Sequence, residues 1–223
     1  MGFSRVYDIN DCGQILGVSQ NSRLVIWQPG KGFKDLGPSK YPGGRAITWG
    51  CLNNKGEAVG TLVTTAGHRF GWMCTPKKGM VDFEPCLLGI NDCGRVVGGP
   101  LEYGYDSAFV WSKGYYRYLG TLGGLESSAN AINNADTVVG TADLPGGERH
   151  GFHWKKSQGM LDVNDLIYGY TDYMVTDCLK VSEKGWILAY GSKPDRLDCA
   201  LLLIPHNSAK PKTSTASGLT LPP

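Results

Sequence analysis

The chain has 223 residues and a formal net charge of +2, with 19% charged and 41% hydrophobic residues. This length allows one domain with a substantial apolar core. Lysines and arginines are scattered, with no more than two side by side. Non-specific nucleic-acid binding needs a concentrated basic surface, so the composition argues against nucleic acid as a partner. No apolar run has the length of a transmembrane helix.

A nine-residue signature recurs five times. Its first copy reads Ile-Asn-Asp-Cys-Gly-Gln-Ile-Leu-Gly, and the copies begin 38 to 49 residues apart, at Ile9, Leu52, Ile90, Ile132 and Val181. Periods of this size are typical of repeat architectures, in which each unit needs a neighbour to bury its apolar face. The Asn and Gly of the signature favour a tight turn between two strands.

Two more strands follow each turn. The third strand carries large apolar residues at a spacing of two, which places them on one face. Its five centres are Val25-Ile-Trp27, Phe70-Gly-Trp72, Phe109-Val-Trp111, Phe152-His-Trp154 and Leu201-Leu-Leu203. A turn with Gly and a short fourth strand come next in the first four copies. Four short strands in about 40 residues predict one propeller blade. We therefore expect an all-β, five-bladed β-propeller of antiparallel four-stranded blades over residues 1–205, with one helical turn near Val163–Ile167.

The fifth copy has no obvious fourth strand after Pro205. Residues 206–223 are rich in Pro, Ser, Thr and Lys and are predicted to form a flexible tail. The tail could supply the missing strand from residues 218–221, a partner could supply it, or the blade could stay three-stranded. An uncovered edge favours binding of another chain.

One position of the signature is Gly or Ala in all five copies, and Gly98 holds it in the third. A branched side chain is expected to clash there, so Gly98→Val is predicted to be far more damaging than a substitution in the tail.

Seven cysteines, with no Cys-x-x-Cys pair, favour free thiols in a reducing compartment over a zinc cluster. The first repeat begins near the first residue, and no signal peptide precedes it. A cytoplasmic location is therefore expected from this chain, and an extracellular or cell-envelope location if the precursor is longer.

The fourth copy carries a more specific pattern: Leu-Gly-Thr-Leu-Gly-Gly at residues 119–124, Asn-Ala-Ile-Asn at 130–133, and His-Gly-Phe-His-Trp at 150–154. These residues resemble the HAF repeat of bacterial proteins often described as extracellular. The resemblance spans residues 3–205 and implies a propeller-like β-repeat fold. It implies no catalytic residues.

Histidines and extra aromatic residues are the candidate site residues. His68 and His150 share one repeat position, but two histidines in five copies do not predict a metal ring, and we expect a structural role. Tyrosines and tryptophans outside the repeated positions suit binding surfaces or sugar stacking, or ordinary packing between blades. They are Trp49, Tyr103, Tyr105, Tyr115, Tyr116 and Trp186. No metal and no cofactor is expected.

Three functions are compatible with this pattern. The first is a non-enzymatic interaction module, a rigid scaffold component of a larger protein complex that binds other proteins through the tail and the closing blade. The second is a small-ligand or glycan-binding propeller that uses its funnel or the grooves between blades. The third is a glycoside hydrolase, for which no pair of carboxylates stands out. The first is the function predicted from the sequence.

Overall fold

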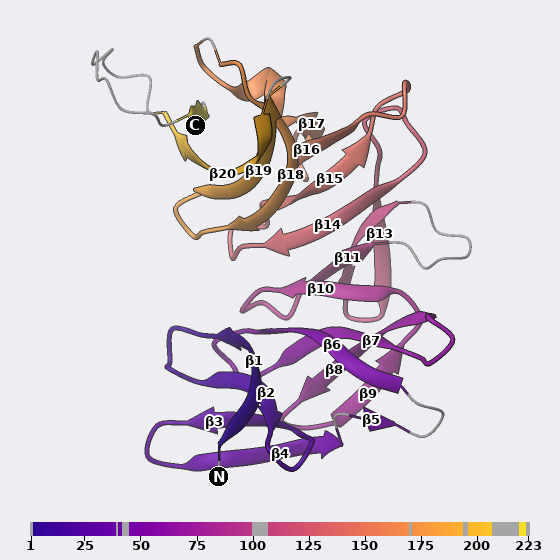
Figure 1. Cartoon of the computed structure of the whole chain (residues 1–223), viewed down its shortest axis with the longest axis vertical. Helices are drawn as coiled ribbons and strands as arrows, with labels where there is room; N and C mark the ends of the chain where they lie inside the picture. The colour runs from indigo at the N-terminus through magenta and orange to yellow at the C-terminus, as the bar shows by residue number, and fades with distance from the viewer. Residues whose placement is uncertain are drawn as a thin grey trace. The chain divides into compact units, whose positions relative to one another are not determined.

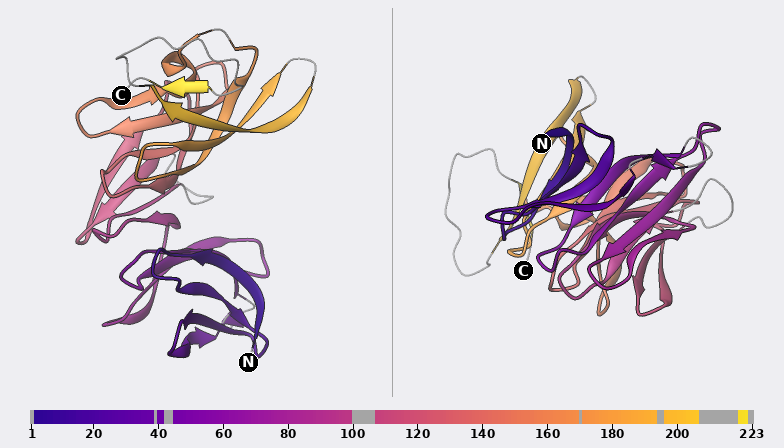
Figure 2. Two further views of the ribbon diagram at one scale, coloured as in Figure 1. Left: turned by 90° about the vertical axis from the view of Figure 1, so that its left-hand side faces the viewer. Right: turned by 90° about the horizontal axis from the view of Figure 1, so that it is seen from below.

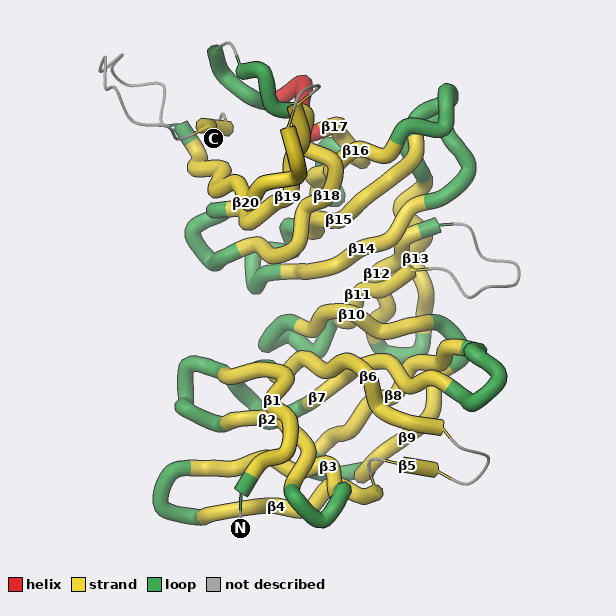
Figure 3. Tube along the Cα trace, viewed as in Figure 1, coloured by secondary structure: helices red, strands yellow, loops and turns green. Residues whose placement is uncertain are grey.

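The computed structural model describes residues 2–38, 40–41, 45–99, 107–169, 171–193, 196–206 and 219–221. Within these residues the structure is almost entirely strand (Figures 1 and 3), which confirms the all-β prediction. The only helical element described is a 3₁₀ turn, η1 (Val163–Leu166), at the place where a helical turn is expected. The strands form five sheets that follow one another along the chain, numbered here sheet 1 to sheet 5.

Each repeat begins a new sheet, and consecutive strands are neighbours within it. Sheet 1 contains β1 (Phe3–Ile9), β2 (Ile15–Ser19), β3 (Arg23–Gln28) and β4 (Gly32–Pro38). Sheet 2 contains β5 (Lys40–Tyr41), β6 (Arg45–Leu52), β7 (Ala58–Val63), β8 (Arg69–Thr75) and β9 (Gly79–Phe83). Sheet 3 contains β10 (Cys86–Ile90), β11 (Val96–Gly99), β12 (Ala108–Ser112) and β13 (Tyr115–Gly120).

The last two sheets complete the described strands. Sheet 4 contains β14 (Ser127–Ile132), β15 (Val138–Asp143), β16 (Arg149–Lys155) and β17 (Gly159–Asp162). Sheet 5 contains β18 (Met174–Val181), β19 (Ile187–Lys193), β20 (Arg196–Pro205) and β21 (Leu219–Leu221). The pairs of sheets 1, 2 and 4 are antiparallel, and the strands are twisted and curved (Figure 2).

Two sheets depart from the predicted four-stranded antiparallel blade. In sheet 2 the link from the first repeat folds back on β6, where Tyr41 pairs with Arg45, and this adds β5 as a fifth strand. In sheet 5 the tail supplies the fourth strand, and β21 pairs parallel with β20. Of the three alternatives for the last blade, the structure therefore shows the strand from the tail.

The chain divides into two compact units. Unit 1 comprises Met1–Tyr105 and Val110–Tyr116, and unit 2 comprises Asp106–Phe109 and Arg117–Pro223. Unit 1 contains sheets 1 and 2 and most of sheet 3, and unit 2 contains sheets 4 and 5. The closure of five sheets into one ring stays a prediction.

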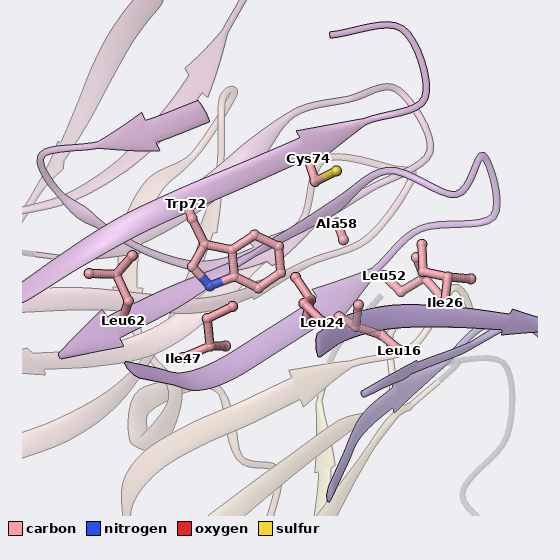
Figure 4. Packing of buried hydrophobic residues seen from close by; sticks show 9 residues of the cluster. All are labelled: Leu16, Leu24, Ile26, Ile47, Leu52, Ala58, Leu62, Trp72 and Cys74. Atoms are coloured by element: carbon pink, nitrogen blue, oxygen red, sulfur yellow. The ribbon is translucent and has the colours of Figure 1, made fainter. Parts of the chain in front are cut away.

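Sheets that follow one another within a unit bury their apolar residues against each other. In unit 1, Leu16 and Leu24 of sheet 1 pack with Ile47, Leu62 and Trp72 of sheet 2, and the Trp72 ring lies among these side chains (Figure 4). Trp72 is fully buried. Each Å² of apolar surface that is removed from water stabilises the fold by about 25 cal/mol, so such contacts make the main stabilising contribution.

Unit 2 repeats this packing between sheets 4 and 5. Ala131 and Val139 of sheet 4 lie in one cluster with Val175, Cys178 and Ile187 of sheet 5. All five side chains are buried. Within each unit one sheet thus covers a face of the next, as expected for repeats that cannot form a core alone.

An asparagine shapes the signature turn in each of the first four copies. The Asn53 Oδ1 accepts hydrogen bonds from the backbone N–H groups of Lys55 (3.0 Å) and Glu57 (2.9 Å), which closes its own turn. Its Nδ2 donates to the backbone oxygen of Asn91 (3.0 Å) in the equivalent turn of sheet 3. Only a side chain with both an acceptor and a donor at this length can cap one turn and bond the next.

The same bonds recur elsewhere in the chain. The Asn10 Nδ2 donates to the backbone oxygen of Asn53 (2.9 Å), and the Asn133 Nδ2 donates to that of Ser182 (2.9 Å). The asparagines therefore join each turn to the next one within a unit, in addition to the turn-forming role predicted from the sequence.

The recurrent glycine of the second strand allows a close approach of the first strand. A Cβ on Gly140 would overlap the backbone oxygen of Ser128 and lie 2.9 Å from the Cα of Ala129. The register of β14 shifts between Ala129 and Ala131, opposite this glycine. Equivalent overlaps occur for Gly17 with the Arg5 oxygen and for Gly60 with the Trp49 oxygen. These overlaps support the expected intolerance of branched residues here.

Candidate ligand-binding groove

A cavity of about 570 Å³ lies between sheets 2 and 3 of unit 1. Met73 of β8 and Val81 and Phe83 of β9 form one wall, and Trp111 of β12 faces them. The Phe83 and Trp111 rings meet edge to face, with centroids 5.3 Å apart and planes at 87°. We call this cavity the Trp111 groove. Its volume and its aromatic, largely apolar lining are typical of small-molecule sites.

Trp111 is only partly buried, as is Trp27, although Trp72 and Trp154 occupy the same repeat position. Trp72 is 0% exposed and Trp154 is 8% exposed. The difference arises from the facing sheet: leucines of sheet 1 pack on Trp72, whereas Met73 and Val81 leave space beside Trp111.

The link between the two sheets does not fill this space. Only two residues separate Phe83, the end of β9, from Cys86, the start of β10. In unit 2 the corresponding link forms η1, and its Val163 is fully buried in the cluster with Val175. The space beside Trp111 therefore stays open in unit 1 because the link is short. In unit 2, residues of η1 help to fill the corresponding space between sheets 4 and 5.

The rim of the Trp111 groove is basic. Lys55 extends from the β6–β7 turn, and Lys77 and Lys78 form the β8–β9 turn. One carboxylate, Glu57, also lines the groove, and its Oε2 accepts a hydrogen bond from the Asn53 Nδ2 (2.8 Å). Three ammonium groups and one carboxylate above an apolar floor favour a ligand with an apolar body and an anionic group.

The aromatic residues predicted to bind a ligand lie elsewhere. The Trp49 Nε1 donates to the Leu88 oxygen (3.3 Å), so this ring has a structural contact, although 40% of the residue is exposed. Tyr115 and Tyr116 on β13 are 81% and 40% exposed. None of these three lines the Trp111 groove.

The remaining predicted aromatics are also outside it. Trp186 is 42% exposed and belongs to unit 2, where the Lys184 ammonium lies 5.9 Å from its ring centroid. Tyr103 and Tyr105 lie outside the described residues. A role for these aromatics in binding stays a prediction.

His150 connects strands within unit 2. Its Nδ1 lies 2.5 Å from the Asp162 Oδ2, and both side chains are about one-eighth exposed, at 13% and 12%. The Asp162 Oδ1 caps η1 by accepting a hydrogen bond from the Asn164 N–H (2.8 Å). The Asn164 side chain in turn donates from Nδ2 to the Val175 oxygen of β18 and accepts at Oδ1 from the Val175 N–H. The histidine therefore contacts an aspartate of its own sheet, and the link to the next sheet passes through Asn164.

His68, at the same repeat position, is exposed in the loop before β8. Its backbone N–H donates to the Thr64 Oγ1 (3.0 Å). In the described part of the chain, no three His, Cys, Asp or Glu side chains are grouped so that they could hold a metal ion.

His153 is a partly buried titratable group that the sequence pattern does not single out as functional. Its Nδ1 is buried and has no hydrogen-bond partner among the described residues. Burial, with a smaller contribution from the charge of Lys155, lowers the pKa of His153 from 6.5 to about 4. The imidazole is therefore neutral in the folded protein at pH values where it is protonated in the unfolded chain.

We expect the stability of the protein to fall as the pH decreases from 6.5 to 4. In this window the unfolded chain binds a proton at His153 and the folded chain does not, which disfavours folding by up to roughly 2–3 kcal/mol. A His153→Leu variant lacks this contribution. Urea unfolding at pH 7.0 and pH 4.5 should show a smaller pH dependence for the variant than for the unmodified chain. Equal pH dependences would contradict the assignment.

Comparisons with known proteins give a limited result. No protein-family model matches the chain. No curated protein matches it either. Among solved structures, the chain is similar to the X-ray structure of a candidate gluconolactonase, with 14% identity and a TM-score of 0.39 over 76% of this chain and 70% of that one. A likeness at this level carries no argument for a particular activity.

This comparison nevertheless corrects the function predicted from the sequence. The similar structure is described by an enzyme name, so the prediction of a non-enzymatic interaction scaffold is withdrawn, and the expectation that the chain is not an enzyme has no support. No helix among the described residues has the length and apolar character to cross a membrane.

Proposed function

We propose that this chain binds a small organic anion with a planar apolar ring in the Trp111 groove. The observation that carries the proposal is the combination in one cavity of about 570 Å³ of an aromatic, apolar floor with three lysines at the rim. The ring packs beside Trp111 and Phe83, and the anionic group lies near Lys55, Lys77 or Lys78. A small-ligand site in a groove between blades is the second of the functions compatible with the sequence. The groove lining adds the chemical class of the ligand, an aromatic anion.

A neutral glycan is supported less well by the same lining. A sugar would stack on Trp111, but its hydroxyl groups need several directed hydrogen-bond partners. Besides the lysines, the side chains with such groups here are Glu57, Thr75 and the indole N–H of Trp111. The HAF-repeat relationship and protein partners at the tail stay predictions that do not bear on this site.

Dansylglycine is a suitable probe because it joins an aromatic ring to one carboxylate. We expect it to bind the intact chain with a blue-shifted fluorescence, and to bind the Trp111→Ala variant about 30-fold more weakly, since loss of an aromatic anchor costs about 2 kcal/mol. Trp111→Phe should retain most of the affinity. Dansylamide, which has the same ring without the carboxylate, should bind about threefold more weakly than dansylglycine.

Trp186→Ala is the matched control. It removes a tryptophan that is also partly exposed, 42% in this case, from unit 2 and should leave the affinity unchanged. Circular dichroism and thermal unfolding establish that each variant is folded. Absence of dansylglycine binding to the folded chain, or equal affinities of the chain and its folded Trp111→Ala variant, would refute the proposed function.

A further inference from the structure

A second, smaller cavity of about 270 Å³ lies between sheets 1 and 2 of unit 1. Lys31, Gly32, Phe33 and Lys34, at and after the β3–β4 turn, contribute to one side of it. Lys55 and Pro76 line both this cavity and the Trp111 groove. The two hollows therefore adjoin at these residues. We call the smaller one the Lys34 cavity.

The Lys34 cavity differs from the Trp111 groove in its chemistry. Its lining includes three lysines, Lys31, Lys34 and Lys55, together with Gln14 and Gln28, and no acidic side chain among the described residues. The neighbouring carboxylate Asp35 bonds Arg23 (2.9 Å) instead. The positive charge of this cavity is thus not balanced by an acid in its wall.

The charge of Lys34 acts on sheet 2. Burial raises the pKa of the Cys74 thiol on β8, and the nearby Lys34 ammonium opposes that shift. Together the two cavities have five lysines and one glutamate in their walls, while the whole chain has a net charge of only +2. Positive charge is therefore concentrated along one path from the Lys34 cavity to the Trp111 groove.

We propose that the two cavities form one extended site, in which the Lys34 cavity binds a second anionic group of the ligand. This inference rests on the proposed function, because the ring of the same ligand lies in the Trp111 groove. The ligand class is an elongated organic dianion: a planar ring at one end and two carboxylate, phosphate or sulfate groups directed toward Lys55 and Lys34. The Gln14 and Gln28 amides add donors for the oxygens of the second group.

Dansylglutamate and dansylglycine test the second subsite, because they share the ring and differ in having two carboxylates or one. We expect dansylglutamate to bind the intact chain about fivefold more tightly, as partly exposed ion pairs contribute modestly. In a Lys31→Ala/Lys34→Ala variant this advantage should disappear, and the affinity for dansylglycine should stay unchanged. The advantage should also decrease as the salt concentration rises.

The control variant, Lys156→Ala/Lys184→Ala, removes the same charge from exposed positions in unit 2 and should keep the fivefold advantage. Equal affinities of the two probes for the intact chain, or an advantage that survives in the Lys31→Ala/Lys34→Ala variant, would overturn the second subsite. Either result leaves the proposed function standing if Trp111→Ala still weakens dansylglycine binding. Failure of dansylglycine to bind at all would refute both.

Discussion

Replacing Gly140 with valine is expected to lower the free energy of unfolding by about 4 kcal/mol or more. The added Cβ would overlap the Ser128 oxygen of the neighbouring strand, and a backbone atom cannot move aside as a flexible side chain can. The first strand would have to separate from the second, with loss of ladder hydrogen bonds and of the packing of Val139 against sheet 5. Overpacking against backbone explains why the expected cost exceeds that of an ordinary core substitution.

Ala135→Val is the matched control for this effect. Ala135 is exposed in the turn between β14 and β15 of the same sheet, so an added branch there should change the stability by about 0.5 kcal/mol or less. Urea unfolding monitored by circular dichroism compares the two variants. Similar midpoints for Gly140→Val and Ala135→Val would show that the glycine is not required for the close approach.

Asn53→Ala is expected to lower the free energy of unfolding by about 3 kcal/mol, since loss of each buried hydrogen-bond partner costs about 1–3 kcal/mol. Asn53 is only 4% exposed. Its side chain accepts from two backbone N–H groups of its own turn and donates to the Asn91 oxygen and to Glu57. Alanine removes the acceptor of the Lys55 and Glu57 N–H groups, and it leaves the Asn91 oxygen with the hydrogen bond from the Gly94 N–H, beside a nearly fully buried position.

Two further variants separate the roles of the Asn53 amide. Asn53→Asp retains the acceptor for the turn but loses the donor, and its charge would lie beside the Glu57 carboxylate, so we expect a comparable loss of stability at neutral pH. Gln158→Ala removes an exposed amide and should have almost no effect. Thermal unfolding at pH 7 measures all three. A stable Asn53→Asp variant would contradict the importance of the bond to the next turn.

The regular parts of the fold could be predicted because their signals are local and repeated. Asparagine and glycine at fixed positions predict the turns, and the alternating apolar residues predict the strands between them. The short strand β5 could not be predicted, since the two residues Lys40 and Tyr41 pair with Arg45 and Ala46 through the fold of the link rather than through an apolar pattern. The same applies to the parallel direction of β21.

The Trp111 groove could not be predicted because Trp111 has the sequence pattern of a core residue. Of its repeat equivalents, Trp72 and Trp154 are buried and Trp27 is partly buried, and nothing in the local pattern distinguishes the four. The exposure of Trp111 depends on Met73 and Val81 of another sheet and on the short link after Phe83. The extra aromatics break the repeat and are therefore the binding residues that the sequence favours, yet those that are described do not line the groove.

The most direct test of the account is a crystal structure of the chain grown with saturating dansylglycine. The account predicts density for the ring beside Trp111 and Phe83, with the carboxylate within reach of Lys55, Lys77 or Lys78. Density for the probe at another place, or an empty groove in crystals where packing leaves Trp111 accessible, would contradict it.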